Sequence, residues 1–598
     1  MLSLWKLRVG VESYYLAQVA SGLDEYYTGS GEATGRWLGS GSQVLGLDDD
    51  VQADDLRAVL AGLAPGTGFT PNGTQLTTHA RRVPGFDLTF SVPKSVSVAW
   101  ALGDPLVQAE IVAGCEAAVA QAVRWLEREA CFVRRGTNNR AMAAEGAEFG
   151  TRRMVADGFI AASFRHRTSR LGDPHLHWHV LVANIARGID GRWTALDGTA
   201  LYAAQRTAGV VFQAAMRQEL TGRLGVDWGP SHRDVSEIAG VPGTVLREFS
   251  QRTEQIAEWL DVHGVEGVAA KNEGLLATRT SKRSFDDAAT LEAGWLDRAT
   301  QAGWGPADLD RLLATTAVTH IDDRDRFQVI DTLWVDGDPV TTARTATFEE
   351  WLSRLLVDRV TATSGTFTRF ELTQAIAGNL PAGATLRQAE ALTHRALASP
   401  MIVAVDDQWA VAGPARAPLG KTVTDDRALR FTTAELLDIE RRFLDRLGNG
   451  VGTDCGVLPD DVIASVIALA TLGPDQALAV QRIGRSGDQI SVMVGRAGTG
   501  KTHTLGSVRA AYEEAGWDVI GLAPSARAAR ELVDGAGIAS TTIARHLHEQ
   551  RIVTATTLVI VDEAGMAGVR DIAAIVEQAS LAGAKVLLVG DHRQLPEV

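Results

Sequence analysis

The chain has 598 residues, of which 45% are apolar and 22% are charged, and its formal net charge at pH 7 is −15. Its length predicts about three or four domains with cores of their own, and its composition excludes a disordered or fibrous chain. Three scattered cysteines, no N-terminal secretory signal and no apolar run of about eighteen residues together predict a cytoplasmic protein without membrane insertion.

Residues 1–40 contain four of the six tyrosines of the chain, arranged as the pairs Tyr14-Tyr15 and Tyr26-Tyr27. The first pair begins a helix-like stretch, and the second precedes the glycine-rich run TGSGEATG. Paired tyrosines are most often packing residues. A phenolate is nevertheless a competent nucleophile on phosphorus when a metal ion and a base lower the barrier, so a metal site elsewhere in the chain would make these tyrosines catalytic candidates.

The string GFDLTFSVPKSVS, residues 85–97, predicts a half-buried strand that ends at Pro93. Its side chains alternate, with apolar residues on one face and Asp87 on the polar face. An acid in this position is usually just solvated, so the pattern alone gives Asp87 and the following Lys94 no function. Residues 105–130 then predict an amphipathic helix.

Between residues 131 and 170 the sequence contains eight arginines and three acidic residues. The negative charge of the whole chain argues mildly against a nucleic-acid protein, but total charge is a poor guide to a multidomain chain. The local excess is either a path for phosphates or an ordinary solvated face. The arginines are Arg134, Arg135, Arg140, Arg152, Arg153, Arg165, Arg167 and Arg170.

Residues 159–184 predict two strands, FIAASFRHR and LHWHVLVAN, joined by the turn TSRLGDP. His177 and His179 share one face of the second strand, and His166 near the end of the first strand can supply a third imidazole. Three imidazoles with open coordination positions suit a divalent metal, such as Mg, Mn or Zn, that must also bind a substrate. His175 has the same parity, so spacing alone does not decide which three of the four bind.

A run of residues in this hairpin resembles the metal-site signature of conjugative relaxases of the TrwC/TraI type, which are HUH endonucleases. The run consists of His166, Thr168-Ser169-Arg170, Asp173-Pro174, Leu176-His177, His179 and Asn184. The paired tyrosines, the glycine-rich stretch with its tryptophan and the string at residues 85–97 look like the same family. The resemblance covers roughly residues 1–305 and implies an α+β domain whose antiparallel sheet holds a metal ion.

The resemblance also implies roles for individual residues. It makes His166, His177 and His179 the metal ligands and gives His175 no ligand role. It places Asp87 beside these histidines, where the carboxylate would orient a ligand imidazole or accept a tyrosine proton. The expected phosphate contacts are Lys94, Arg152, Arg153 and Arg170.

The same resemblance makes Tyr14 the nicking nucleophile and Tyr26 the candidate for a second transfer, with Tyr15 and Tyr27 as further catalytic candidates. The two pairs are further apart than the family pattern leads us to expect. The implied reaction is a transesterification on single-stranded DNA that leaves a 5′-phosphotyrosyl link.

Residues 306–445 are less informative. Two short helices, within residues 367–376 and 385–397, precede strands predicted at residues 402–404 and 409–411. This order is typical of a winged-helix module, and a plain helical connecting region fits equally well.

From residue 446 onward the sequence predicts a parallel α/β domain of the RecA type. The string GRAGTGKT follows a strand, precedes a helix and matches the phosphate-loop pattern, in which backbone N–H groups and a lysine hold the phosphates of ATP and a hydroxyl binds Mg²⁺. The apolar strand LVIV is followed by Asp562 for the metal and Glu563 to activate water. The phosphate-loop candidates are Gly495, Gly498, Gly500, Lys501 and Thr502.

The strings PDQ, APSAR and GDHRQLP of this region resemble RecD-like superfamily-1 helicases, which move 5′ to 3′. By this resemblance Gln476 contacts adenine and Gln594 senses the γ-phosphate. Motors of that family close the nucleotide site with a second RecA-like domain and its arginine, and the chain stops at Val598. We therefore expect a C-terminally truncated motor without helicase turnover.

The sequence thus predicts a conjugative relaxase (1–305), a connecting region (306–445) and a partial helicase (446–598). Its expected partners are single-stranded DNA at an origin of transfer, a coupling protein or secretion machinery, and accessory relaxosome proteins. One alternative is a rolling-circle replication initiator, although there the tyrosine usually follows the histidines. A second alternative is a non-catalytic DNA-binding scaffold in the motor part. A plain helicase leaves the first 300 residues unexplained.

Overall fold

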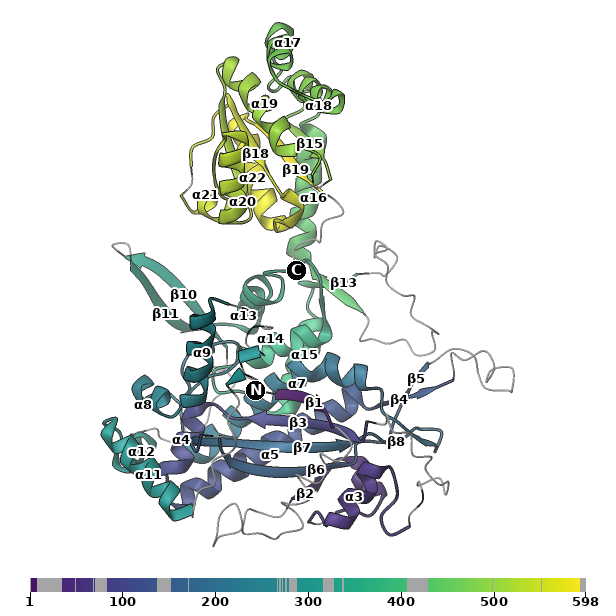
Figure 1. The fold of residues 1–598 in the computed structure, drawn as a ribbon, viewed down its shortest axis with the longest axis vertical. Helices are drawn as coiled ribbons and strands as arrows, with labels where there is room; N and C mark the ends of the chain where they lie inside the picture. Colours follow the sequence, from purple (N-terminus) through teal and green to yellow (C-terminus); the bar gives the residue numbers. More distant parts are fainter. Residues whose placement is uncertain are drawn as a thin grey trace. The chain divides into compact units, whose positions relative to one another are not determined.

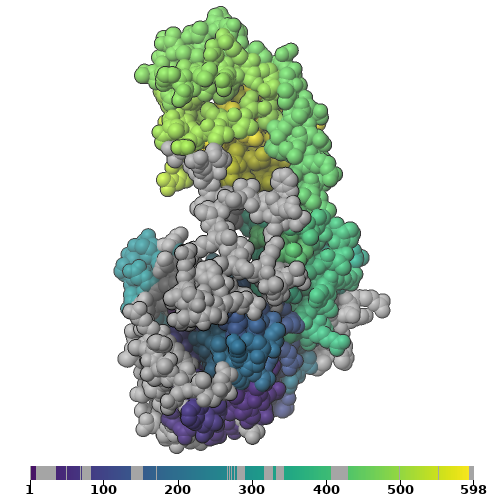
Figure 2. All heavy atoms as spheres, turned by 90° about the vertical axis from the view of Figure 1, so that its right-hand side faces the viewer, coloured from purple at the N-terminus to yellow at the C-terminus, as the bar shows by residue number. Residues whose placement is uncertain are grey.

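The computed structural model describes residues 2–7, 35–136 apart from 49, 68 and 70–82, 152–265 apart from 170, short stretches of 267–278, 288–315, 327–405 apart from 336–337, and 429–591 apart from 497 and 550. The chain divides into two compact units. The first consists of Met1–Leu355, Arg369–Leu397 and Ala410–Ala428, and the second of Leu356–Thr368, Ala398–Trp409 and Leu429–Val598. Figure 2 shows all atoms, with the residues outside the description in grey.

The first unit is built on a five-stranded sheet in the order β1-β3-β7-β6-β2, and every neighbouring pair is antiparallel (Figure 1). The predicted α+β domain with an antiparallel sheet is confirmed. The predicted histidine hairpin is also present, with His166 directly opposite His177. The strands are β1 (Leu2–Lys6), β2 (Arg36–Leu38), β3 (Gly85–Ser91), β6 (Ala161–Thr168) and β7 (Pro174–Ala183).

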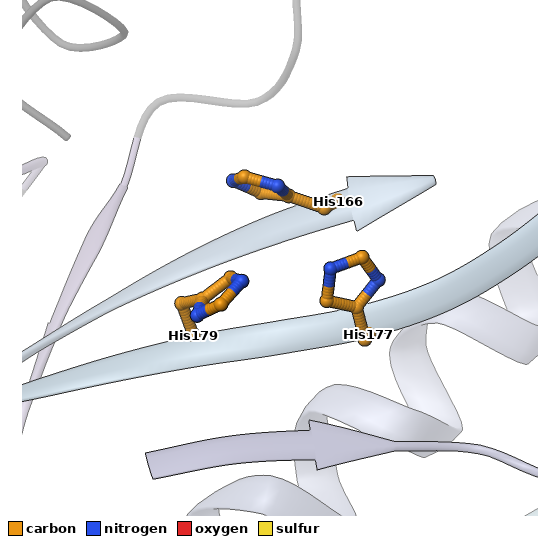
Figure 3. Close-up of side chains that lie close together, drawn as sticks. All are labelled: His166, His177 and His179. Atoms are coloured by element: carbon orange, nitrogen blue, oxygen red, sulfur yellow. The ribbon is translucent and has the colours of Figure 1, made fainter. Parts of the chain in front are cut away.

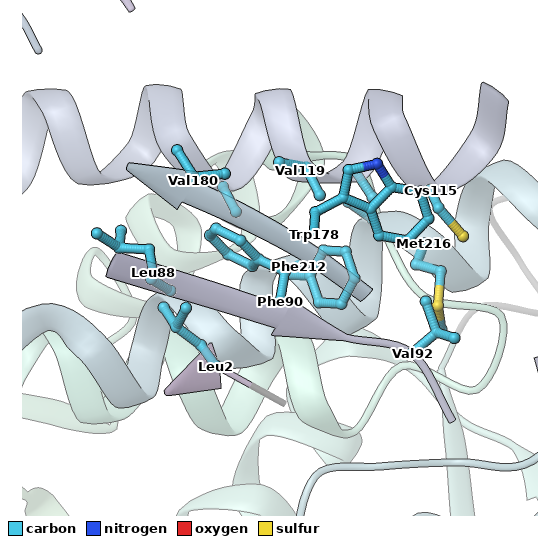
Figure 4. Close-up of a cluster of buried hydrophobic side chains, with 14 of the residues drawn as sticks. Leu2, Leu88, Phe90, Val92, Cys115, Val119, Trp178, Val180, Phe212 and Met216 are labelled. Carbon is cyan, nitrogen blue, oxygen red and sulfur yellow. The ribbon is translucent and has the colours of Figure 1, made fainter. Parts of the chain in front are cut away.

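Helices cover one face of this sheet. The predicted helix at 105–130 is α5 (Pro105–Ala130), and it packs with α4 (Lys94–Leu102) and α7 (Gly198–Leu224) over the strands. Figure 4 shows the core between them, where Trp178 of β7 meets Val119 of α5 and Phe90 of β3 meets Phe212 of α7. The Phe90 and Phe212 rings lie 5.2 Å apart. Because alternate strand residues point here, this face is almost wholly apolar.

On the opposite face, the described residues of a second apolar cluster cover part of the sheet. This cluster joins α3 (Ala53–Ala61) to Trp37, Phe164 and Leu181 of the sheet. The next residues along β6 and β7 on this face are His166 and His179. The described part of this cluster therefore ends where the histidines begin, and of these His166 is buried whereas His177 and His179 are half-buried.

Within the described residues, α5 is long and apolar enough to cross a membrane by length and composition. Its buried residues form a stripe that includes Ile111, Ala118 and Leu126 and contributes to the core of the first unit. This is the arrangement of a core helix, with polar residues on the remaining surface.

The remaining described elements of the first unit surround this framework. Arg217 of α7 donates to the carbonyl of Ala377 in α14 and to that of Leu380 just beyond it, and the Trp125 ring packs at a tilt against Phe370. The elements are α2 (Ser40–Val44), β4 (Phe132–Arg135), β5 (Arg152–Val155), β8 (Ala186–Arg187), β9 (Trp193–Thr194), α8 (Gly243–Glu248), α9 (Gln251–His263), α11 (Ala288–Gln301), α12 (Pro306–Thr315), β10 (Gln328–Val335), β11 (Asp338–Thr345), α13 (Phe348–Leu355), α14 (Arg369–Gly378) and α15 (Leu386–Leu397).

The second unit contains a five-stranded parallel sheet in the order β15-β19-β18-β16-β17, which confirms the predicted parallel P-loop domain. Its strands are β15 (Ile490–Val494), β16 (Asp518–Ala523), β17 (Ala539–Thr542), β18 (Thr557–Val561) and β19 (Lys585–Gly590). Its described helical segments are η1 (Leu356–Val360), α16 (Ala434–Asn449), α17 (Asp460–Leu469), α18 (Pro474–Arg485), α19 (Lys501–Glu514), α20 (Ala526–Ala536), α21 (Ile543–Glu549), η3 (Ala564–Met566) and α22 (Val569–Ala582).

The expected connecting region, 306–445, is shared between the two units. The predicted short helices are α14 and α15, which pack in the first unit. The predicted strand at 402–404 is part of β13 (Ile402–Val405), which joins β12 (Phe367–Thr368) and β14 (Arg430–Thr433) in the second unit. The strand predicted at 409–411 lies outside the described residues, and the winged-helix module stays a prediction.

Candidate metal centre and nucleotide site

Three histidines converge on the face of the antiparallel sheet that carries the second apolar cluster (Figure 3). His166 lies on β6, and His177 and His179 lie on β7, with His166 opposite His177 and Phe164 opposite His179. One ring nitrogen from each histidine lies within 4.8 Å of the other two. Nitrogen ligands sit ~2.0–2.1 Å from a metal such as zinc, so small side-chain rotations would bring all three onto one ion.

Hydrogen bonds fix the tautomers of two of these rings. The Nδ1 of His177 lies 2.8 Å from the carbonyl oxygen of His175, which can only accept, so Nδ1 carries the proton. The Nδ1 of His179 lies 2.9 Å from both carboxylate oxygens of Asp87 and is protonated for the same reason. In each neutral ring Nε2 then carries the lone pair, so Nε2 is the atom that can bind a metal.

Asp87 comes from β3, the neighbour of β7, and the residue is 6% exposed. Thr89, directly opposite His179, lies 3.2 Å from the same Nδ1 and donates its hydroxyl to Asp87. The first of the two predicted roles, orientation of a ligand imidazole, therefore agrees with this geometry. A carboxylate behind a histidine also raises the basicity of that ligand.

His175 lies outside the group of three. Its ring packs against that of His177 at a tilt of 31°, with centroids 4.7 Å apart. Burial lowers the pKa of His175 well below its usual value, and the neighbouring His177 and Lys94 lower it further. A neutral ring outside the group of three fits the expectation that His175 has no ligand role.

Three side chains from two helices contact the turn between β6 and β7. Trp295 Nε1 of α11 donates to the Gly172 carbonyl at 2.7 Å, and Arg298 of the same helix pairs with Asp173 at 3.0 Å. Lys94 Nζ at the start of α4 donates to the Pro174 carbonyl at 2.8 Å. Because this turn sets the relative position of the two histidine strands, these contacts position the three histidines.

Lys94, expected to contact DNA phosphate, is thus directed at the turn. Burial lowers its pKa to about 8, although Asp173 and Glu237 partly oppose that effect. The carboxylate of Glu237 accepts the backbone N–H of Lys94 and of Ser95, which satisfies the first turn of α4. The phosphate contact of Lys94 stays a prediction.

Several arginines of the basic segment are paired with acids. Arg134 and Arg153 both bind the buried Asp197, each at 2.6 Å, and Arg135 forms a two-pronged pair with Asp190. Burial alone would raise the pKa of Asp197, but hydrogen bonds from Arg134, Thr199 and Arg153 outweigh it and lower the pKa to about 2. These pairs place part of the arginine excess in the framework of β4, β5 and the start of α7.

Several predicted site residues cannot be placed. Tyr14, Tyr15, Tyr26, Tyr27, Arg170 and Gln594 lie outside the described residues, as does the side chain of Arg152.

The second unit forms a phosphate loop at the carboxyl end of its sheet. The loop follows β15 and leads into α19, and Gly498 and Gly500 both have a φ of 78°, which glycine adopts without strain. Lys501 Nζ folds back onto the Gly495 carbonyl at 2.9 Å, and Thr502 follows it in the first turn of α19. Gln476 at the start of α18 donates to the Thr499 carbonyl at 3.3 Å. The structure therefore brings Gln476 to the loop, as expected for a nucleotide contact.

The acidic pair follows β18, and β19 separates that strand from β15. Burial raises the pKa of Asp562. Burial is also the largest cause of the raised pKa of Glu563, and the negative charges of Asp562 and Glu531 raise it further. Parallel strands end at one edge, so the acids and the phosphate loop lie along the same carboxyl edge of the sheet, which is the edge where nucleotides bind to such sheets.

The two units define the class of the chain, a relaxase domain followed by a helicase-type nucleotide-binding domain. Comparison with protein families agrees, because residues 9–302 match the family described as TrwC relaxase and residues 471–598 match the family described as AAA domain. The chain therefore carries a TrwC-type relaxase domain followed by an AAA-type domain.

Individual relatives cover parts of the chain. The multifunctional conjugation protein TraI of Escherichia coli is 29% identical over 313 residues, which are 49% of this chain and 16% of TraI. A probable conjugal transfer protein TraA of Sinorhizobium fredii is 34% identical over 174 residues, 28% of this chain and 16% of that protein. A solved structure of the conjugative relaxase TrwC with oriT DNA is 29% identical, covers 51% of this chain and 100% of its own, and has a TM-score of 0.43. The chain thus spans about a sixth of the length of these curated relatives.

The sequence did not point to the residues that position the site. Ser97, Trp295 and Arg298 hold the histidine hairpin from α4 and α11, and Ser97 Oγ accepts the N–H of Leu176 at 3.0 Å. The one local signal was the Asp-Pro pair of the turn, which marks a tight connection but not its partners.

Proposed function

We propose that the first unit nicks and rejoins single-stranded DNA at an origin of transfer. The observation that carries this proposal is the three-histidine cluster, in which Asp87 and the His175 carbonyl fix the donor nitrogens of His179 and His177. The matched TrwC relaxase has been solved in complex with oriT DNA, including in a metal-bound form, which supports the same substrate class here.

His166, His177 and His179 would hold a divalent ion, for which Mg, Mn or Zn is proposed; three imidazole donors match Zn²⁺ best, and Mg²⁺ or Mn²⁺ would take its remaining ligands as oxygen. When bound, that ion withdraws electron density from the scissile phosphate and stabilises the charge that develops on it. The Tyr14 hydroxyl attacks this phosphorus, the P–O3′ bond breaks, and the DNA strand leaves with a 3′-hydroxyl. The tyrosine proton passes to a base, for which Asp87 is a candidate, and the 5′-phosphate remains on the tyrosine.

Rejoining reverses these steps, and Tyr26 is proposed for a second transfer, with Tyr15 and Tyr27 adjacent to the two nucleophiles. Lys94, Arg152, Arg153 and Arg170 are proposed DNA contacts. The same proposal includes a cytoplasmic location and, as partners, a coupling protein or secretion machinery and accessory relaxosome proteins. It also includes the division of the chain into regions 1–305, 306–445 and 446–598.

The second unit is proposed to bind Mg·ATP as part of a RecD-like 5′–3′ helicase motor. Gly495, Gly498 and Gly500 would admit the phosphates, Lys501 would contact the terminal phosphates, and Thr502 and Asp562 would hold Mg²⁺. Glu563 would activate water, Gln476 would contact adenine and Gln594 would sense the γ-phosphate. The support is the loop geometry, with Gln476 already bonded to Thr499.

The test uses the full chain and single-stranded oligonucleotides that carry candidate origin sequence from the neighbouring locus. With Mg²⁺ or Mn²⁺ present, we expect a covalent protein–DNA adduct that withstands denaturing electrophoresis, and peptide mapping should place it on Tyr14. Tyr14→Phe keeps the ring and should form no adduct in the first cleavage. An adduct mapped to Tyr26 or Tyr27 would contradict the assigned order, and nicking without any adduct would contradict the mechanism.

A further inference from the structure

A large aromatic side chain stands exposed on the metal face of the sheet. Leu2 and Leu4 of β1 are buried in the core on the helix side, so the alternating side chains of Ser3 and Trp5 point to the other side. Trp5 is directly opposite Asp87 in the β1–β3 register. Residues opposite each other in antiparallel strands point to the same face, so Trp5 shares its face with the three histidines.

The register also places Trp5 close to the metal ligands. Opposed residues of antiparallel strands have Cα atoms ~4.5–5.5 Å apart, and neighbouring strands are spaced by ~4.8 Å. Asp87 contacts His179, so Trp5 stands one strand beyond Asp87, at the edge of the sheet. A nucleotide next to the one whose phosphate lies at the histidines can reach that edge.

The side chain of Trp5 is 64% exposed within the described part of the chain. On the same face of the chain, Ser3 is polar and Leu7 is buried in the second apolar cluster, so among the described neighbours on β1 the exposed indole is not part of an apolar patch of the kind that docks proteins. An isolated indole beside a phosphate-handling site suits one unpaired base, because every base has a flat face that stacks on an aromatic ring.

We propose that Trp5 is a base-stacking subsite of the relaxase domain. This inference rests on the proposed nicking of single-stranded DNA. The indole stacks on one unpaired base beside the phosphate held at His166, His177 and His179, and it thereby fixes the position of that phosphate along the strand. Trp5 touches the DNA but takes no part in the bond changes.

The experiment measures binding of fluorescein-labelled single-stranded DNA of candidate origin sequence by anisotropy, with EDTA present so that the strand stays intact. A second set of oligonucleotides replaces one base at a time by an abasic site. Stacking of one base contributes enough that Trp5→Ala should weaken binding of the intact strand by about 5- to 150-fold. Trp5→Phe should retain most of the affinity.

The abasic series supplies the decisive result. At one position the abasic site should weaken the wild-type chain as much as Trp5→Ala does, and the two changes combined should cost no more than either alone. Tyr202→Ala is the matched control, because Tyr202 is an exposed aromatic of α7, on the other side of the sheet. It should leave affinity unchanged, and thermal unfolding should show that all three variants are folded.

Two outcomes overturn the subsite. In one, Trp5→Ala binds the intact strand as tightly as the wild type does. In the other, Trp5→Ala weakens every abasic oligonucleotide by the same factor, so that no base is its partner. If the wild-type chain forms the tyrosine adduct in either case, the proposed nicking function stands and only the stacking subsite is refuted. A wild-type chain that binds none of the oligonucleotides and forms no adduct refutes both proposals.

Discussion

Replacement of Asp87 by asparagine tests the proposed metal centre without touching a ligand. In the structure both carboxylate oxygens lie 2.9 Å from His179 Nδ1, and the residue is 6% exposed. Asparagine keeps the shape and one acceptor oxygen but loses the charge. Its amide can also turn an N–H toward Nδ1, which would move the ring proton to Nε2 and remove the lone pair that binds the metal.

Loss of a partner behind a metal-binding histidine typically weakens metal binding ~10- to 100-fold, which is about 1.4–2.7 kcal/mol. The asparagine side chain retains one acceptor, so we expect a loss of about 10-fold for Asp87→Asn and about 100-fold for Asp87→Ala. Isothermal titration of the purified chain with Mn²⁺ or Zn²⁺ measures this directly and needs no nicking.

Asp197→Asn is the matched control, because Asp197 is also a buried acid but its partners are Arg134 and Arg153, which lie outside the histidine group. It should lower thermal stability and leave metal affinity unchanged. Unchanged metal affinity in both Asp87 variants, or an equal loss in Asp197→Asn, would refute the argument that Asp87 acts through His179.

Three further predictions follow from the same contacts. His166→Ala, His177→Ala and His179→Ala should each abolish metal-dependent nicking of an origin oligonucleotide, whereas His175→Ala should largely preserve it; equal loss in His175→Ala would overturn the choice of three ligands. Lys501→Ala should abolish binding of a fluorescent ATP analogue, because Lys501 lies in the phosphate loop 2.9 Å from the Gly495 carbonyl, and should leave nicking unchanged; retained nucleotide binding would contradict the loop assignment. The pKa of Asp197 is lowered to about 2 from 3.8, so its ion pairs stabilise the fold above about pH 4 and cease to do so as the pH falls toward 2. The contribution is on the order of 2 kcal/mol at neutral pH, so Asp197→Asn should lower the unfolding midpoint at pH 7 and differ little from wild type near pH 2; a constant difference across this range would count against the pairing.

The sequence by itself determined the local parts of this protein. The histidine strands were visible because period-two alternation is a property of one strand, and α5 was visible because its apolar stripe repeats with the helical period. The phosphate loop was visible because its glycines and lysine must lie close together in the chain to wrap one phosphate group. Alternation could not choose among the four histidines, and it was the family resemblance that selected three of them.

The tertiary structure decided which distant residues serve those parts. Asp87 lies 92 positions from His179 and meets it only through the β3–β7 register. Trp295 and Arg298 reach the turn from a helix more than a hundred residues further along, and Lys94, expected at DNA, donates to that turn. Such pairings depend on the free energy of packing the whole domain, and alternation within a strand fixes which face a side chain takes but not which strand lies beside it. The three clustered histidines could therefore be predicted from the chain together with the family resemblance, whereas the residues that hold them in place could be found only in the fold.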